Sequence, residues 1–163
     1  MSKKQIAMKK KKLIRIIAIL GITGLVIGGG AGLYMFNKPH RDIQSKDADF
    51  SLTASEVVEE YLTNEEAANQ KYLSSDGDSK ILEITGIVSS ISEDFNGQKI
   101  VFFEGESDKA GVKASFTHET NSSLNNVQIG QTITVKGVIR SGASYDEDLE
   151  MYEHVILEKS DIV

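Results

Sequence analysis

The stretch that decides the fold runs from Val127 to Ile139 and reads VQIGQTITVKGVI. After a turn-like start, small or apolar residues take every second position, namely Ile133, Val135, Gly137 and Ile139. Successive side chains of a β-strand point to opposite faces, so this period of two predicts a strand over residues 132–139 with one face turned to a core.

Three more strands are predicted upstream. From Lys80 onward, a strongly apolar set alternates with a mixed one, and the apolar set is Leu82, Ile84, Gly86 and Val88. A hairpin signal at Asn96-Gly97 then precedes the apolar run from Lys99 to Glu104. After the polar segment 105–111, residues 112–117 alternate again. These three strands therefore form a meander.

A helix is predicted before the first strand. Thr53 and Glu56 have the spacing of a capping box, and Leu52 and Val57 have that of a hydrophobic staple. Apolar residues follow at helical spacing, which predicts one apolar face. The helix either continues to Tyr72 or breaks at Thr63-Asn64 and restarts.

The remaining segments complete the plan. Residues 119–128 are polar and predict at most one helical turn at 122–126, residues 141–148 predict a long loop, and residues 151–157 predict a final strand. Helix, three strands, a break and two strands is the order of an oligonucleotide/oligosaccharide-binding (OB) barrel. The predicted fold class is therefore mainly β with α, a helix followed by a five-stranded OB-fold β-barrel.

Several motifs resemble one family. Val127 to Ile139, Ala67 to Leu73 (AANQKYL) and Ile84 to Val88 (ITGIV) are similar to the corresponding segments of the tRNA_anti-like OB-fold family. The order of a membrane segment, then Asn37 to His40 and then Ala48 to Phe50 resembles its small, membrane-attached envelope members of the Bacteroidota type. The resemblance covers nearly the whole chain and implies the OB fold and the periplasmic face of an inner membrane, but its motifs carry no chemistry.

A membrane segment is predicted near the N-terminus. Residues 16–36 form a run of 21 residues without a charge, and seven basic residues precede it. A helix of this length spans about 30 Å, the hydrocarbon thickness of a bilayer, and the basic cluster predicts that the N-terminus stays inside. The predicted organisation is a basic cytoplasmic tail over 1–15, a transmembrane helix over 16–36, a linker over 37–50 and the OB-fold domain with its helix over 51–163. A signal peptide cleaved near Gly29-Gly30-Ala31 is the alternative.

One face of the predicted membrane helix carries small residues. Gly24, Gly28 and Gly32 recur every four residues and so share a face that lets a second helix approach closely. This spacing gives the hypothesis of a homodimer through the transmembrane helix. The alternative is that glycine is simply frequent in membrane helices.

The charge of the chain is divided between its two parts. Residues 1–36 hold seven basic and no acidic side chains, whereas residues 37–163 hold 11 basic and 24 acidic ones, a net charge of −13. An anionic domain repels phosphate backbones, so nucleic acid is disfavoured as a partner. The chain has no cysteine, which excludes disulfides, thiol catalysis and thiolate metal sites.

Candidate catalytic and metal-binding residues are few. None of the three histidines, His40, His118 and His154, stands at a metal-ligand spacing from another, and no phosphate loop or nucleophile elbow occurs. We therefore expect no enzyme activity, no cofactor and no metal site. A dense acidic loop, formed by Asp146, Glu147, Asp148, Glu150 and Glu153, leaves a Ca²⁺-dependent module as the weakest hypothesis, because it lacks the EF-hand pattern.

A ligand face follows from the usual binding surface of OB folds. That surface comprises the second and third strands with the loops between strands one and two and between strands four and five. In this chain it comprises Phe95, Phe102 or Phe103, Lys113, Thr117, Ser144 and Tyr145. Aromatic rings beside a lysine can stack on sugars or bases. Only one of Phe102 and Phe103 can face outward, because neighbours on a strand point oppositely.

The sequence thus predicts a membrane-anchored, non-catalytic OB-fold binding or interaction module of the bacterial cell envelope. Its expected position is the inner membrane, single-pass, with the C-terminal domain in the periplasm. An envelope protein or a glycan is the expected partner. The alternative is a nucleic-acid-binding OB-fold protein, as the name of the family suggests.

Overall fold

The computed structural model describes residues 29, 43–75 and 77–163, and its compact unit is Asp42–Val163. Strand β1 (Phe50–Thr53) leads into the helices α2 (Ala54–Thr63) and α3 (Glu65–Tyr72). The remaining elements follow in chain order: β2 (Ile81–Glu93), β3 (Lys99–Phe103), β4 (Val112–Phe116), the 3₁₀ helix η1 (Asn121–Leu124), β5 (Thr132–Ser141), β6 (Ser144–Asp146), β7 (Met151–Glu153) and β8 (Val155–Ile162).

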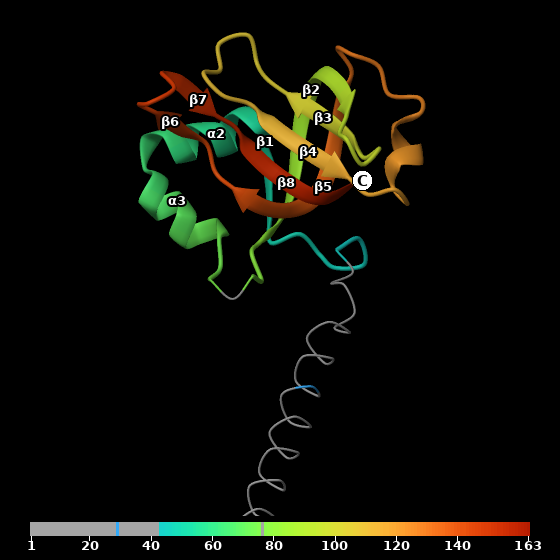
Figure 1. Ribbon diagram of the computed structural model, residues 1–163, viewed down its shortest axis with the longest axis horizontal. Coiled ribbons are helices and arrows are strands. Elements are labelled where there is room, and N and C mark those ends of the chain that lie inside the picture. Colours follow the sequence, from blue (N-terminus) through green and yellow to red (C-terminus); the bar gives the residue numbers. More distant parts are fainter. Residues whose placement is uncertain (1–28, 30–42, 76) are drawn as a thin grey trace, which may run out of the picture. The chain divides into compact units, whose positions relative to one another are not determined.

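Five strands close into a barrel (Figure 1). The hydrogen-bonded order is β2-β3-β4-β8-β5, and β5 pairs back with β2. All of these pairs are antiparallel except β4 with β8, which is parallel. The break that holds η1 lies between β4 and β5, where the sequence predicts it. The prediction of a mainly β fold with a five-stranded barrel after a helix is therefore confirmed.

The barrel interior is filled by the apolar side of each strand. Leu82, Ile84 and Val88 of β2 are fully buried, as are Val135 and Ile139 of β5, in agreement with the period of two. Two glycines on these strands make room for neighbours. A Cβ on Gly86 would lie 2.9 Å from the ring of Phe103, and one on Gly137 would lie 2.6 Å from Ser160 Oγ. Gly137 also lies where the register between β5 and β8 shifts.

The helical region breaks at Asn64. The Asn64 side-chain oxygen accepts a hydrogen bond from Ala67 N at 3.0 Å, which caps α3, while Asn64 N donates to Glu60 O at the end of α2. At the start of α2, Thr53 Oγ1 accepts from Glu56 N, and the Glu56 carboxylate accepts from Thr53 N at 2.7 Å. The predicted capping box is therefore present. Of the two alternatives that the sequence left open, the structure has two separate helices.

Three elements differ from the sequence predictions. The short parallel strand β1 is missed, since it pairs with the remote residues Leu82 to Thr85. The expected loop 141–148 contains β6. The expected final strand 151–157 is found in strand conformation but is interrupted at His154, so its first part is β7 and its second part begins β8, which extends to Ile162. The hairpin β6–β7 stands outside the core with mostly exposed residues, so no buried face imposes a clear period.

Residues 43–50, within the segment predicted as a linker, contact the barrel. Ile43 is buried, Gln44 Nε2 donates to Lys159 O at 3.0 Å, and Lys136 Nζ donates to Gln44 O at 3.0 Å. The Asp49 carboxylate accepts from Ile81 N at 2.8 Å.

The predicted transmembrane helix 16–36 lies outside the described residues except for Gly29. The tail 1–15, the small face of Gly24, Gly28 and Gly32, and His40 also lie outside them. Among the residues that are described, no helix has the length and apolar character that crossing a bilayer requires.

Candidate functional site

Strand β3 turns one phenylalanine inward and one outward. Phe103 is fully buried and meets Gly86 in the core, whereas Phe102 is half-buried on the outer side of the barrel. Its register partner on β4 is Lys113, which is exposed. Phe102 is therefore the member of the pair that can contact a ligand, and Phe103 is excluded from the predicted face.

Phe102 has two neighbours on this outer surface. The His154 ring lies edge-on with its centroid 4.8 Å from that of Phe102, and Lys113 Nζ lies 5.9 Å from the Phe102 centroid. His154 Nδ1 accepts a hydrogen bond from Gly111 N at 3.1 Å. Burial first, and the Lys113 charge second, lower the pKa of His154. The imidazole therefore stays neutral at pH 7 and keeps Nδ1 as an acceptor.

The hairpin β6–β7 carries a second pair of rings. The Tyr145 and Tyr152 centroids are 4.9 Å apart, and Tyr145 is 50% exposed. Lys109 Nζ, from the loop between β3 and β4, lies 5.8 Å from the Tyr152 centroid. Ser144 Oγ donates to the Glu153 carboxylate across the hairpin at 2.8 Å. A lysine therefore lies near an aromatic ring here too, as Lys113 lies near Phe102.

The short segment 152–154 joins the two pairs. We define the aromatic strip as Phe102, His154, Tyr152 and Tyr145, with Lys113 and Lys109 beside it. Such a surface offers ring faces for stacking and two ammonium groups for hydrogen bonding. Figure 1 shows the hairpin β6–β7 at the end of the barrel where α2 and α3 lie, away from η1.

The structure brings together only part of the predicted ligand face. Phe102, Lys113, Ser144 and Tyr145 lie at the end of the barrel that carries the hairpin. Phe95 is fully exposed in the turn between β2 and β3, at the other end of these strands. Thr117 lies at that end too, since it follows β4, and its N donates to Thr120 Oγ1 at 2.9 Å.

Sequence reasoning missed three residues of this surface, Tyr152, His154 and Lys109. Tyr152 and His154 are two positions apart in a segment with an alternating pattern, which is the signal that they share a side. Lys109 gives no such signal, because only the folding of the loop brings it over Tyr152. His154, which has no metal-ligand spacing to another histidine in the sequence, contacts Phe102.

The acidic loop folds on itself. The Asp146 carboxylate accepts from Asp148 N and from Leu149 N, both at 2.9 Å. Within residues 43–75 and 77–163, no three histidine or carboxylate side chains are arranged to hold a metal ion.

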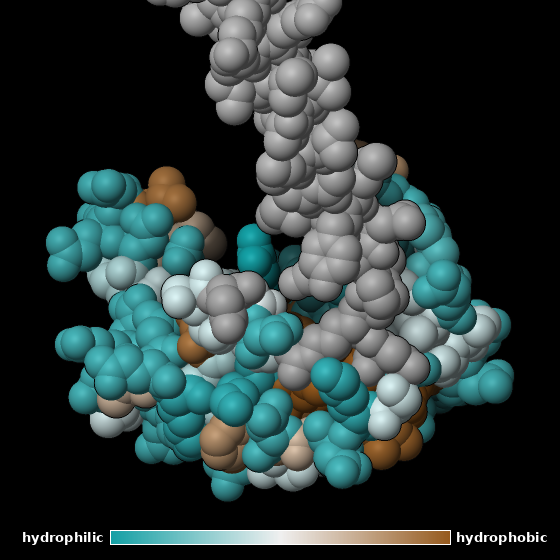
Figure 2. Space-filling view, turned by 90° about the horizontal axis from the view of Figure 1, so that it is seen from below, coloured by the Kyte–Doolittle hydropathy of each residue, from teal (hydrophilic) through white to brown (hydrophobic). Residues whose placement is uncertain are grey.

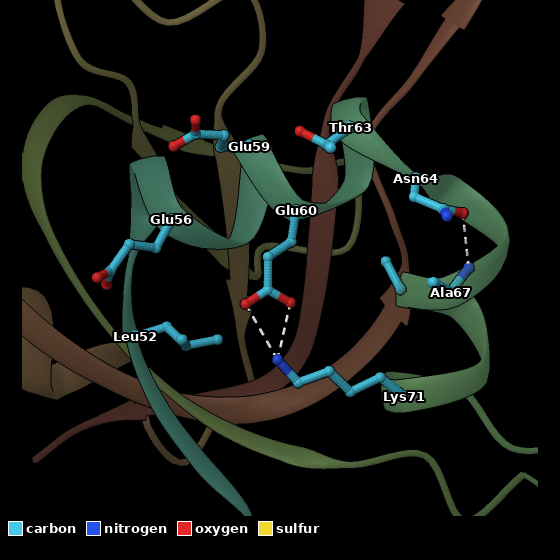
Figure 3. A pocket seen from close by; sticks show the side chains of 9 residues that line it. Leu52, Glu56, Glu59, Glu60, Thr63, Asn64, Ala67 and Lys71 are labelled. Carbon is cyan, nitrogen blue, oxygen red and sulfur yellow. Dashed lines mark hydrogen bonds and ion pairs between the residues drawn. The ribbon is translucent and has the colours of Figure 1, made fainter.

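A separate crevice of about 460 Å³ lies between α2 and α3 (Figure 3). Lys71 Nζ reaches across it to both Glu60 carboxylate oxygens, at 2.8 and 3.0 Å, and Tyr72 OH donates to the same carboxylate at 2.8 Å. The Lys71 hydrogen bond lowers the pKa of Glu60 and raises that of Lys71. Glu56 and Glu59 line the same crevice, which makes it predominantly anionic.

The face seen in Figure 2 is largely hydrophilic where the folded unit is visible, with small apolar areas scattered among polar ones. Acidic side chains also accompany the lysines near the aromatic strip. The negative charge of Glu104 opposes the other effects and raises the pKa of His154. Glu153 follows Tyr152 on the hairpin. Lys109 and Lys113 therefore do not form a uniformly basic surface.

Comparison with known proteins identifies a family and similar solved structures. The model of the tRNA_anti-like family matches residues 8–147. No curated protein sequence matches. A solved structure from Klebsiella pneumoniae subsp. pneumoniae MGH 78578, described as a "putative nucleic acid-binding lipoprotein", is similar with a TM-score of 0.49 and 16% identity, covering 77% of this chain and 99% of that chain.

Proposed function

This chain belongs to the tRNA_anti-like family, and from that premise we propose that its barrel is a non-catalytic binding module that uses the aromatic strip to hold a protein or glycan partner. The observation that carries the proposal is the grouping of four rings at one end of the barrel, of which Tyr145 is half-exposed. Rings fixed by neighbouring elements offer contact area at little entropic cost, which is how aromatic residues contribute to recognition.

The chemistry of the strip supports binding over catalysis. His154, the histidine in the strip, uses Nδ1 to accept from the Gly111 backbone and packs on Phe102, so it serves to fix the loop and the ring. A general base must instead present its nitrogen to a reacting proton within hydrogen-bonding distance. We infer that His154 positions Phe102.

The location follows from the N-terminal sequence. Residues 1–15 are basic and residues 16–36 carry no charge, which favours a single-pass anchor in the inner membrane with the N-terminus inside. The barrel then lies in the periplasm, where envelope proteins and glycans are available as partners. A homodimer through Gly24, Gly28 and Gly32 remains part of this proposal.

A nucleic-acid-binding role is the alternative, and one observation favours it. Lys113 and Lys109 each lie within 6 Å of an aromatic ring, an arrangement that also suits stacked bases and phosphates. Against it stand 24 acidic side chains in residues 37–163 and the acidic neighbours of the strip. Phosphate binding weakens steeply as salt rises, whereas protein or glycan binding need not.

The test is a pull-down from chemically crosslinked, detergent-solubilised envelope with the full-length protein as bait. The matched variants are Tyr145→Ala, in the strip, and Phe95→Ala, at the other end of the barrel. We expect Tyr145→Ala to lose the specific partner and Phe95→Ala to retain it. Equal recovery by both variants would contradict the assignment of the strip as the binding face.

A further inference from the structure

A cavity of about 320 Å³ lies next to the aromatic strip, between the helices and the hairpin β6–β7. Its lining includes Tyr61 from α2, Glu65 from α3, Lys109, and three residues of the hairpin, Ser144, Tyr145 and Tyr152. Two rings of the strip thus form part of its wall. The volume is at the lower end of the range for small-molecule sites, which suits a ligand of about one ring.

Tyr61 is the most deeply buried of the lining residues, with 1% of its surface exposed. Its hydroxyl has no hydrogen-bond partner within the part of the chain that the structure describes. Burial raises the pKa of Tyr61 to about 12, so the hydroxyl is neutral and can both donate and accept. Less than 1 Å² of the hydroxyl oxygen is accessible, so Tyr61 helps to close the cavity and its hydroxyl does not open into it.

The other lining groups define the chemistry that fits. Lys109 donates, Glu65 accepts, and Ser144 does both, so hydrogen-bonding groups of both kinds surround the space. One cation and one carboxylate leave no net charge, which disfavours a phosphate or a metal ion. The Tyr145 and Tyr152 rings provide apolar faces. A neutral molecule with an apolar face and many hydroxyl groups satisfies all of these features.

We propose that this cavity is a saccharide subsite that holds one neutral sugar ring, with further rings of the same oligosaccharide lying along the aromatic strip. The apolar face of a pyranose stacks on Tyr145 or Tyr152, and its hydroxyl groups bond to Glu65, Lys109 and Ser144. This inference rests on the proposed binding function and narrows its partner to a glycan.

The experiment titrates the full-length protein, in a detergent without a sugar headgroup, with three neutral tetrasaccharides, namely those of β-1,4-linked glucose, β-1,4-linked N-acetylglucosamine and α-1,4-linked glucose. Binding is followed by calorimetry and by saturation transfer from protein to ligand. We compare wild type with Lys109→Met and with the matched control Lys99→Met, a lysine whose ammonium group bonds Asn125 and does not line this cavity. Thermal melts verify that each variant is folded.

We expect at least one tetrasaccharide to bind, Lys109→Met to weaken binding about tenfold, which corresponds to about 1.4 kcal/mol, and Lys99→Met to leave it unchanged. Binding that is lost in Tyr145→Ala but unaffected by Lys109→Met would overturn the subsite and leave the proposed function standing. No saccharide binding at about 1 mM ligand would also overturn the subsite, while a pull-down partner dependent on Tyr145 would still support a protein-binding module.

Discussion

The ring of Tyr61 is held against Gly142, and a Cβ at position 142 would overlap that ring. The neighbouring segment has no room to move freely, because Ala143 is fully buried. This single contact fixes how α2 approaches the connection between β5 and β6, and hence the wall of the cavity.

Replacing Gly142 with alanine is therefore expected to destabilise the fold by about 1 to 3 kcal/mol, the usual cost of overpacking. The measurement is a urea unfolding midpoint. The same substitution in a Tyr61→Leu background should cost less, since the overlapping ring is gone. An equal cost in both backgrounds would show that Tyr61 is not the group that Gly142 accommodates.

The unpartnered Tyr61 hydroxyl gives a second prediction at this scale. Tyr61→Phe removes a buried polar group without changing the packing of the ring, so without ligand the variant should be as stable as wild type or up to about 1 kcal/mol more stable. Tyr72→Phe should be less stable, because it deletes the bond to Glu60. Thermal unfolding of both variants decides this. A marked loss of stability in Tyr61→Phe would mean that its hydroxyl has a partner.

Single residues also mark the limit of sequence prediction. Alternation predicts that Phe102 and Phe103 point oppositely, but their direction depends on which residues face them, here Lys113 for Phe102 and the space left by Gly86 for Phe103. Those contacts are made across strands. The period of two alone cannot supply them.

At the scale of elements, the start of α2 was fully predictable, because Thr53 and Glu56 lie three residues apart and need no tertiary partner. Thr53→Ala should cost about 1 kcal/mol of unfolding free energy. Thr63→Ala, an exposed position at the end of the same helix, is the matched control and should cost less. Chemical denaturation of both variants tests this prediction. Equal effects of the two substitutions would show that the Thr53 cap does not stabilise the helix.

The packing of α3 on α2 should depend on pH through Glu60. Its pKa in the folded state is lowered from 4.5, chiefly by the Lys71 hydrogen bond. The stabilisation is therefore present above pH 4.5 and is lost as the pH falls through the lowered value. Melting temperatures between neutral and strongly acidic pH should fall less steeply for Glu60→Gln than for wild type. Glu59→Gln is the control, and identical slopes for wild type and Glu60→Gln would refute the role of the ion pair.

The two unpredicted elements share a physical cause. Strand β1 has four residues and finds its parallel partner about 30 positions away, and the hairpin β6–β7 has three residues on each side and no buried face. Short elements stabilised by remote or mutual contacts leave little periodic signal. The barrel strands are longer and half-buried, so their order and type were predictable.

For the whole molecule, charge and topology act together. The net charge of −13 on residues 37–163 is expected to repel polyanions. Closure of the barrel places the end of β3, the start of β4 and the connection between β5 and β8 at one end. The sequence predicted this general surface through Phe102, Lys113, Ser144 and Tyr145. It also included Phe95 and Thr117, which the strand directions place at the other end.

The most direct test of the account places a photoreactive benzophenone amino acid at Tyr145 or at Phe95 of the full-length protein in its native envelope. Irradiation followed by mass spectrometry identifies what each position touches. The account predicts a specific protein or glycan adduct from position 145 and none from position 95. Adducts from position 95 alone, or nucleic acid crosslinked at position 145, would contradict it.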